Sequence, residues 1–194
     1  MISNTLANFR RAQTAPQAAK QRGVTLMELI AGLSVMAVVT VGALALYNAA
    51  VSSQRATQLT QEITALRGAA TQLWMGQGSF GASDANLADT IIAAGRAPST
   101  LRVTGTAPSR VLHHASGNIS FTSNVSTFHL ALDGIPQSTC VELLSGVTTA
   151  QWAEVRVAAA MAAVGGATPV PMPITPVAAA GACLPTSAIQ FTGS

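Results

Sequence analysis

The feature that most constrains this chain is an uninterrupted apolar stretch close to its amino terminus. Residues 24–50 read VTLMELIAGLSVMAVVTVGALALYNAA, and Glu28 is the only charged residue among them. As an α-helix rising about 1.5 Å per residue, this stretch would span roughly 40 Å, more than the hydrocarbon core of a bilayer, which is about 30 Å thick. The sequence therefore predicts a helix that crosses a membrane.

Charge is distributed unevenly around this stretch. The first 23 residues carry four basic side chains and no acidic one, whereas the remainder carries six basic and seven acidic side chains, a net charge of −1. The basic segment should stay in the cytoplasm, because basic flanks of membrane helices are retained there, and the residues after 50 should face the other side. Since the basicity is confined to this segment, the charge pattern gives no support for a nucleic-acid-binding surface.

A conventional secretory signal peptide is the alternative explanation of the apolar stretch. Ala43 and Ala45 form an A-x-A site at which signal peptidase could cut, releasing a soluble product that begins at Leu46. Such a signal would be unusually long. It would also leave Glu28 without a purpose, although a carboxylate at the bilayer centre costs about 2.5 to 3.5 kcal/mol and usually marks a function.

Residues 22–30, RGVTLMELI, resemble the processing site of type IV prepilins. That site has a basic leader ending in glycine, a hydrophobic first mature residue and glutamate at the fifth mature position. The resemblance implies that a membrane-embedded prepilin peptidase cuts between Gly23 and Val24 and methylates the new amino terminus at Val24. Residues 1–23 would then be a cleaved leader, and its length, with Val24 as first mature residue, resembles the type IVb subfamily. No cofactor is implied.

Cleavage after Gly23 would give Glu28 a partner. It would remove the basic leader and create an α-amino group at the end of an apolar helix. Within one helix this amine lies about one turn from Glu28, but a staggered neighbouring subunit could bring its own amine to the carboxylate. A buried ion pair is tolerated where a lone buried charge is costly, so the pairing would set the axial stagger between subunits. The alternative is that Glu28 extends to the lipid headgroups.

The residues after 50 continue the helix but change its character. Polar side chains now alternate with apolar ones, and no proline interrupts residues 24–75. A single helical stripe, with spacings of 4, 3, 4 and 3, is formed by Leu59, Ile63, Leu66, Ala70 and Leu73. We predict one helix of about 50 residues that ends at Gly76 and Gly78. Its half at 24–50 is transmembrane, and its half at 51–76 packs on the following domain.

Residues 77–194 are expected to form an exported globular domain of short elements. The composition excludes a disordered polymer, because 49% of the chain is hydrophobic and only 9% is charged. Helices are predicted at 86–94, at 136–144 and from 148 to 163, and strands at 110–114, 118–122, 127–132 and 187–192. Residues 167–182 are rich in proline and alanine and should run extended, with little regular structure.

Cys140 and Cys183 are the only cysteines. Export to an oxidising compartment would favour one structural disulfide. The order of elements in the second half resembles the major subunits of type IVb pili, such as toxin-coregulated, bundle-forming and conjugative thin pili. This resemblance implies a Cys140–Cys183 bond that closes a D-region at 140–183. It also implies the α+β type IV pilin fold, in which a long N-terminal helix, transmembrane in its first half, packs on an antiparallel β-sheet.

No catalytic or metal-binding motif emerges from the sequence. His113 and His114 are adjacent and would point to opposite faces of a strand, and His129 stands apart, so the three do not suggest a metal site. No serine lies in a GxSxG motif, and the acidic residues form no recognisable catalytic pair. We therefore expect no enzyme.

The resemblance implies a structural function: the major subunit of an extracellular type IVb pilus on a bacterial surface. The pilus would be a helical homopolymer of this subunit. Pilus assembly machinery would build it from precursors in the inner membrane. The expected role of the pilus is adhesion, aggregation or conjugation. Two alternatives stay open. One is a minor pilin or a type II secretion pseudopilin, and the other, from a different class, is a periplasmic binding protein or enzyme released after Ala45.

Overall fold

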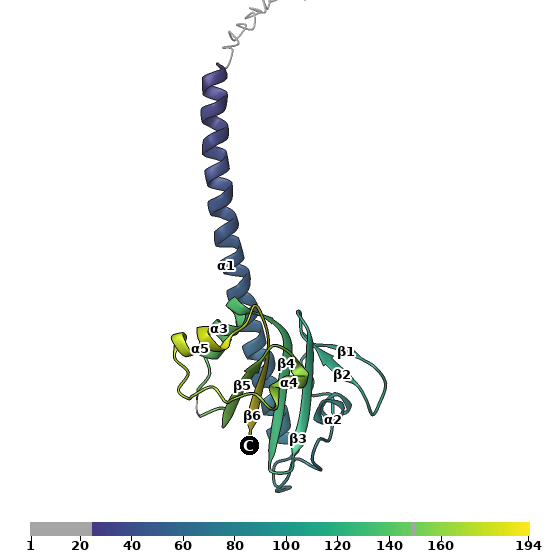
Figure 1. The fold of residues 1–194 in the computed structure, drawn as a ribbon. Helices are drawn as coiled ribbons and strands as arrows, with labels where there is room; N and C mark the ends of the chain where they lie inside the picture. Colours follow the sequence, from purple (N-terminus) through teal and green to yellow (C-terminus); the bar gives the residue numbers. More distant parts are fainter. Residues whose placement is uncertain (1–24, 149) are drawn as a thin grey trace, which may run out of the picture. The chain divides into compact units, whose positions relative to one another are not determined.

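The computed structural model describes residues 25–148 and 150–194. The chain divides into two compact units, Met1–Leu44 and Ala45–Ser194, and each is described by itself. Helix α1 (Leu26–Leu73) begins in the first unit and ends in the second (Figure 1). The prediction of one long helix is confirmed from Leu26 onward. Gly76 and Gly78, which follow it, have φ angles of 82° and 70°, a conformation that glycine adopts without strain.

The second unit is built on a six-stranded antiparallel sheet with the order β1-β2-β3-β4-β6-β5. Its strands are β1 (Arg102–Thr104), β2 (Val111–His113), β3 (Asn118–Asn124), β4 (Thr127–Pro136), β5 (Glu154–Ala158) and β6 (Thr186–Gly193). The last strand, β6, lies in the interior of the sheet between β4 and β5. Its register with β4 runs from Phe128↔Gly193 to Pro136↔Thr186, with a bulge between Leu132 and Ile135.

Four short helices complete the unit. They are α2 (Leu87–Ala93), α3 (Gln137–Ser145), α4 (Met161–Val164) and α5 (Pro176–Ala182). The predicted helices at 86–94 and 136–144 are confirmed within one residue at each end. The predicted strands at 118–122, 127–132 and 187–192 are confirmed and prove longer, whereas β2 is two residues shorter than the strand predicted at 110–114.

The hydrophobic core lies between the second half of α1 and one face of the sheet (Figure 1). Alternate residues of β4 point into it, because successive strand residues face opposite sides. The predicted stripe of α1 is confirmed, with its first four members buried and Leu73 packed at the margin. Fully buried side chains in this core include Phe121, Phe128, Phe191, Leu66, Leu130 and Leu132. A smaller cluster on the opposite face of the sheet joins Ala131 and Ala188 to Val164 of α4.

The helix predicted from 148 to 163 is wrong. Residues Glu154–Ala158 form β5, which pairs with β6 from Glu154↔Thr192 to Ala158↔Ala188, and only Met161–Val164 are helical. The helix was predicted because residues 148–151 resemble a capping box. However, Val155 and Val157 alternate with polar residues and reach the core face, so pairing with β6 outweighs local helix propensity.

Two elements are missing from the sequence-based prediction. Helix α5 lies in the segment expected to be extended. Thr175 caps it, because its Oγ1 accepts the backbone N–H of Ala178 at 3.2 Å, and Pro176 occupies the first turn. Strand β1 has three residues, all exposed, and it forms by pairing with β2 from Arg102↔His113 to Thr104↔Val111.

Candidate functional site

The predicted processing site, Gly23 and Val24, lies outside the described residues. The first described residue, Thr25, opens helix α1. The side-chain Oγ1 of Thr25 accepts the backbone N–H of Glu28 at 3.3 Å, and its carbonyl oxygen accepts the N–H groups of Glu28 and Leu29 at 3.0 and 3.1 Å. Thr25 is therefore the amino-terminal cap of the helix.

Glu28 lies exposed in the first turn of α1. Its negative charge is favourable there, because the first turn of a helix carries the positive end of the backbone dipole. Among the residues that the structure describes, no basic side chain forms an ion pair with Glu28. The arrangement thus presents a capped helix end with a carboxylate that has no counter-charge from the described part of its own chain.

The first half of α1 is apolar around its whole circumference. Its serine and threonine hydroxyl groups are satisfied within the helix, since Ser34 and Thr40 donate to the carbonyl oxygens of Ala31 and Met36, both at 2.8 Å. The large side chains of this half are all more than half exposed in the isolated chain: Leu26, Met27, Leu29, Ile30, Leu33, Val35, Met36, Val38, Val39, Val41, Leu44, Leu46 and Tyr47. By length and composition the helix can cross a membrane. A helix apolar on every side is stable only within an apolar environment.

The Cys140–Cys183 disulfide is present, with a distance of 5.9 Å between the two Cα atoms. Cys140 lies in α3, Cys183 follows α5, and both are buried. Gln137 adds a second link between these elements, because its Nε2 donates to the carbonyl oxygen of Cys183 at 3.2 Å. The bond closes the predicted D-region, which contains β5, α4 and α5.

The three histidines lie in different surroundings. His113 Nε2 lies 2.6 Å from Thr104 Oγ1, His129 Nδ1 lies 3.2 Å from Thr192 Oγ1, and His114 is buried. Burial lowers the pKa of both His114 and His129. Within residues 25–148 and 150–194, no group of three or more His, Cys, Asp or Glu side chains could hold a metal ion.

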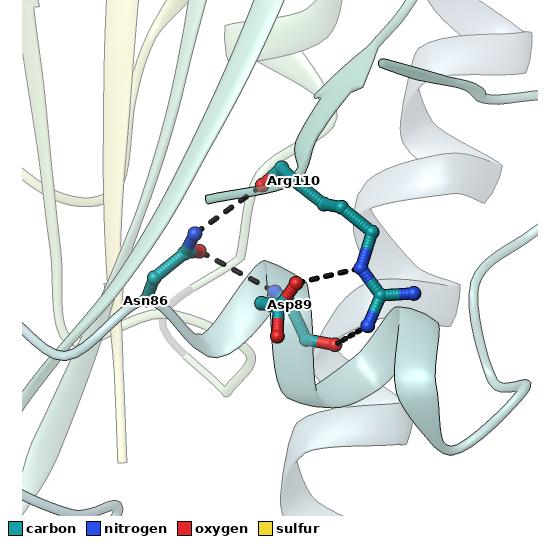
Figure 2. Close-up of polar contacts among 3 residues, drawn as sticks. All are labelled: Asn86, Asp89 and Arg110. Atoms are coloured by element: carbon teal, nitrogen blue, oxygen red, sulfur yellow. Dashed lines mark hydrogen bonds and ion pairs between the residues drawn. The ribbon is translucent and has the colours of Figure 1, made fainter. Parts of the chain in front are cut away.

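One polar cluster was not anticipated from the sequence (Figure 2). Arg110, just before β2, reaches α2, where its Nε lies 2.6 Å from Asp89 Oδ1 and its Nη2 donates to the Asp89 carbonyl oxygen at 3.4 Å. Asn86 caps α2 by accepting the Asp89 N–H at 3.4 Å, and it donates to the Arg110 carbonyl oxygen at 3.2 Å. The sequence indicates the cap, because Asn86 precedes Asp89 by three residues. It gives no local sign of the ion pair, because Arg110 lies 21 residues from Asp89.

Three comparisons relate this chain to known proteins. The PilS N-terminal family model matches residues 53–193. The chain is 29% identical over 131 residues to the toxin coregulated pilin of Vibrio cholerae, covering 66% of this chain and 58% of that protein. It is also similar to the crystal structure of TcpA, a type IV pilin from the El Tor biotype of Vibrio cholerae. That match has 16% sequence identity and a TM-score of 0.46, and covers 73% of this chain and 99% of that one.

The match to the family model spans most of the chain, including the second half of α1, the whole sheet and the disulfide-closed region. The same chain carries an apolar helix ahead of the matched residues, as the sequence predicted. The chain therefore belongs to the PilS family and is a type IVb pilin.

Proposed function

We propose that this chain is the major subunit of an extracellular type IVb pilus and that it polymerises through the first half of α1. One observation carries the proposal: this half is apolar on every side and bears a single carboxylate, Glu28, in its first turn. Such a surface needs apolar neighbours all round. The inner membrane would supply them for the precursor, and the helices of adjacent subunits would supply them in the fibre.

Processing would occur between Gly23 and Val24, by a prepilin peptidase that also methylates Val24. The Thr25 cap supports this position, because helix α1 starts directly after the proposed cut. The rival cut after Ala45 falls inside α1, where the backbone is helical on both sides of the bond. Cleavage at Gly23 would leave the new amine at the end of an apolar helix, within reach of pilus assembly machinery in the inner membrane.

In the fibre, the amine of an incoming subunit would pair with the Glu28 carboxylate of a neighbour. The carboxylate is exposed on α1 and meets no cation among the described residues of its own chain. Burial of either charge alone would be costly, because removing one member of a buried ion pair costs about 3 to 5 kcal/mol. The pairing would therefore select one axial stagger from the many that an apolar surface alone would allow.

Substitution of Glu28 tests this pairing. Glu28→Ala should be processed and inserted normally yet fail to enter fibres, and the nearly isosteric Glu28→Gln should assemble poorly because it lacks the charge. Glu142→Ala is the matched control, since Glu142 lies exposed on α3. Fibre yield would be measured by shearing cells and blotting the sheared material. A wild-type yield from Glu28→Ala would reject the pairing.

The composition of the mature chain offers a second test. No lysine follows Lys20, so a subunit cut after Gly23 has its amino terminus as its only amine. An acylating reagent should modify dissociated subunits once and leave intact fibres unmodified, because the paired amine is buried. Intact mass should place the start at a methylated Val24. Full acylation of subunits in intact fibres, or a chain beginning at Met1 or Leu46, would contradict the proposal.

The role of the fibre is expected to be adhesion, aggregation or conjugation. A major subunit must dominate purified fibres, whereas a minor pilin or a type II secretion pseudopilin would not. Mass spectrometry of the main fibre band decides between them, and absence of this chain from that band would reject the major-subunit proposal. Loss of mating, of cell clumping or of surface attachment in a deletion strain would then distinguish the three roles.

A further inference from the structure

His114 begins the tight turn that connects β2 to β3. Its backbone N–H donates to the Gly117 carbonyl oxygen at 3.0 Å, and its imidazole Nδ1 accepts the backbone N–H of Ser116 at 3.2 Å. Its Nε2 lies 2.9 Å from the carbonyl oxygen of Asp133 in β4. Because Ser116 N–H can only donate, Nδ1 must be unprotonated, and the ring proton must sit on Nε2 and point at Asp133. The Nδ1 bond requires the neutral imidazole, whereas the Nε2–H bond to Asp133 forms in either protonation state.

The turn fits closely against β4. A Cβ atom added to Gly117 would lie 2.5 Å from the Asp133 carbonyl oxygen, and one added to Gly134 would lie 2.5 Å from the Ser116 carbonyl oxygen. Asp133 Oδ1 also accepts the backbone N–H of Asn118. The turn therefore has one close-packed arrangement, and the imidazole of His114 takes part in it through both ring nitrogens.

Helix α1 covers the imidazole from the other side. His114 is 5% exposed, and Glu62 of α1, which is 3% exposed, lines the same small cavity of about 10 Å³ with it and with Arg55. Gln58 Nε2 donates to Glu62 Oε1 at 2.9 Å, but Oε2 accepts no hydrogen bond from any described residue. A buried carboxylate thus lies beside a buried imidazole, and neither neutralises the other by a direct bond.

The charges around His114 act in opposite directions. Burial lowers the pKa of His114 below its ordinary value of 6.5, and the nearby His113 lowers it slightly further. Asp133 and Glu62 raise it, but by less than burial lowers it. An imidazole in a released turn would meet water and recover its ordinary pKa, so protons bind more tightly to the released turn than to the packed one.

We propose that His114 is an acid-sensitive latch, which holds the β2–β3 turn closed on its imidazole while the ring is neutral and releases the Ser116 side of the turn when Nδ1 takes up a proton. The proton enters on the nitrogen that accepts the Ser116 N–H, so that hydrogen bond is lost and two N–H groups face each other. The Ser116 side of the turn then moves away from the imidazole and opens the cavity beside Glu62, which Ser116 also lines.

Hydrogen exchange of the full chain in detergent micelles tests the latch. The observable is exchange in a peptide covering residues 111–118, expressed at each pH as the ratio of wild type to His114→Gln, which cancels the intrinsic pH dependence of exchange. As the pH falls below 6.5, this ratio should rise by up to about tenfold for each pH unit, which is the limit for uptake of one proton. His113→Gln is the matched control and should keep the rise of the ratio in acid, because the His113 ring bonds Thr104 and not the turn.

A charge variant gives an independent arm. Glu62→Gln removes a charge that raises the pKa of His114 in the packed turn, so the exchange ratio should begin to rise at the same pH but continue to rise to a lower pH than in wild type. If His114→Gln does not fold, the wild-type chain alone decides, because selectively labelled histidine gives only three imidazole signals. Titration of His114 at or above 6.5, or exchange ratios near one at every pH, would overturn the proposal.

Discussion

At the scale of single residues, Gly193 shows how closely the sheet packs on its core. A Cβ atom at this position would collide with the ring of Phe128, the cross-strand neighbour of Gly193 in β4. Phe128 in turn contacts Phe80, Phe121 and Trp152, with ring centroids 5.1 to 6.0 Å apart. The absence of a side chain at Gly193 therefore leaves the space that the ring of Phe128 occupies.

We expect Gly193→Ala to lower the free energy of unfolding by about 1 to 3 kcal/mol, the usual cost of overpacking a core. Urea unfolding of the detergent-solubilised chain, followed by fluorescence of Trp74 and Trp152, measures the change. Gly181→Ala is the matched control, since a Cβ there meets no atom within 4 Å. Equal stability of the two variants would contradict the packing argument.

The Arg110–Asp89 pair predicts a pH dependence. The side-chain hydrogen bond from Arg110 lowers the pKa of Asp89 below its ordinary value of 3.8. The folded state therefore binds this proton less readily than the unfolded state, so the stabilisation is present above pH 3.8 and is lost as the pH falls through the folded pKa. Asp89→Asn should be less stable than wild type at pH 6, and the gap should close in acid.

Urea midpoints at pH 6 and at pH 3 check this prediction. Asp84→Asn is the control, because Asp84 is exposed and its φ of 60° suits asparagine equally well. A stability gap between wild type and Asp89→Asn that persists at pH 3 would mean that the pair contributes nothing through its charge.

At the scale of elements, the disulfide joins α5, which has little else to hold it, to α3, which packs in the core. Helix α5 has seven residues, and Ala179 is its only buried one. In the chain-entropy model, a bond closing a loop of 43 residues stabilises the fold by about 4 kcal/mol. The bond therefore supplies stabilisation that the proline- and alanine-rich segment, with its small buried apolar area, cannot provide.

We expect Cys140→Ser and Cys183→Ser each to reduce the abundance of the subunit without changing leader cleavage, because the proposed cut precedes folding of the exported unit. Blotting of whole cells measures both effects: the total signal gives the abundance of the subunit, and the ratio of precursor to processed chain gives the extent of leader cleavage. The double variant should resemble the single ones. Normal subunit levels in any of the three would show that the bond is dispensable for stability.

Some elements were readable from local pattern and others were not. The stripe of α1 was predicted because its helical period repeats over four turns, and β3 and β4 because apolar residues alternate in them. Strand β5 was misread as helix because its pairing with β6 joins residues about 35 positions apart, which no local window contains. Helix α5 was missed although Thr175 and Pro176 carry a local start signal, since the composition of the surrounding segment was weighted above the cap.

The same distinction applies to the candidate site. Glu28 was singled out because a lone carboxylate in an apolar helix is costly, an argument that needs only the sequence. The bonds of His114 were not predictable, since they join it to Asp133 from another strand and place it beside Glu62 of α1. Gly23 and Val24 stay predictions, because they lie outside the described residues.

At the scale of the whole molecule, maturation depends on the proposed cut after Gly23. We expect Gly23→Leu to leave uncut precursor in the membrane and no fibres, because a side chain at this position prevents close approach of the peptidase to the backbone. The control is a leader substitution away from the cut, Gln13→Leu. The size of the chain in membrane fractions and the yield of sheared fibres report the two steps, and normal fibres from Gly23→Leu would refute the processing proposal.

The disulfide also has a mechanical consequence for a chain that serves as a link in a fibre. A subunit under tension lengthens only by unravelling segments that are free to extend, and the disulfide withholds the segment between Cys140 and Cys183, which lie 43 positions apart. At about 3.4 Å per extended residue, that segment represents roughly 145 Å of hidden length in each subunit. A pulled fibre should therefore reach a limiting length that increases when the bond is reduced, and the oxidation state of one cysteine pair would set its extensibility.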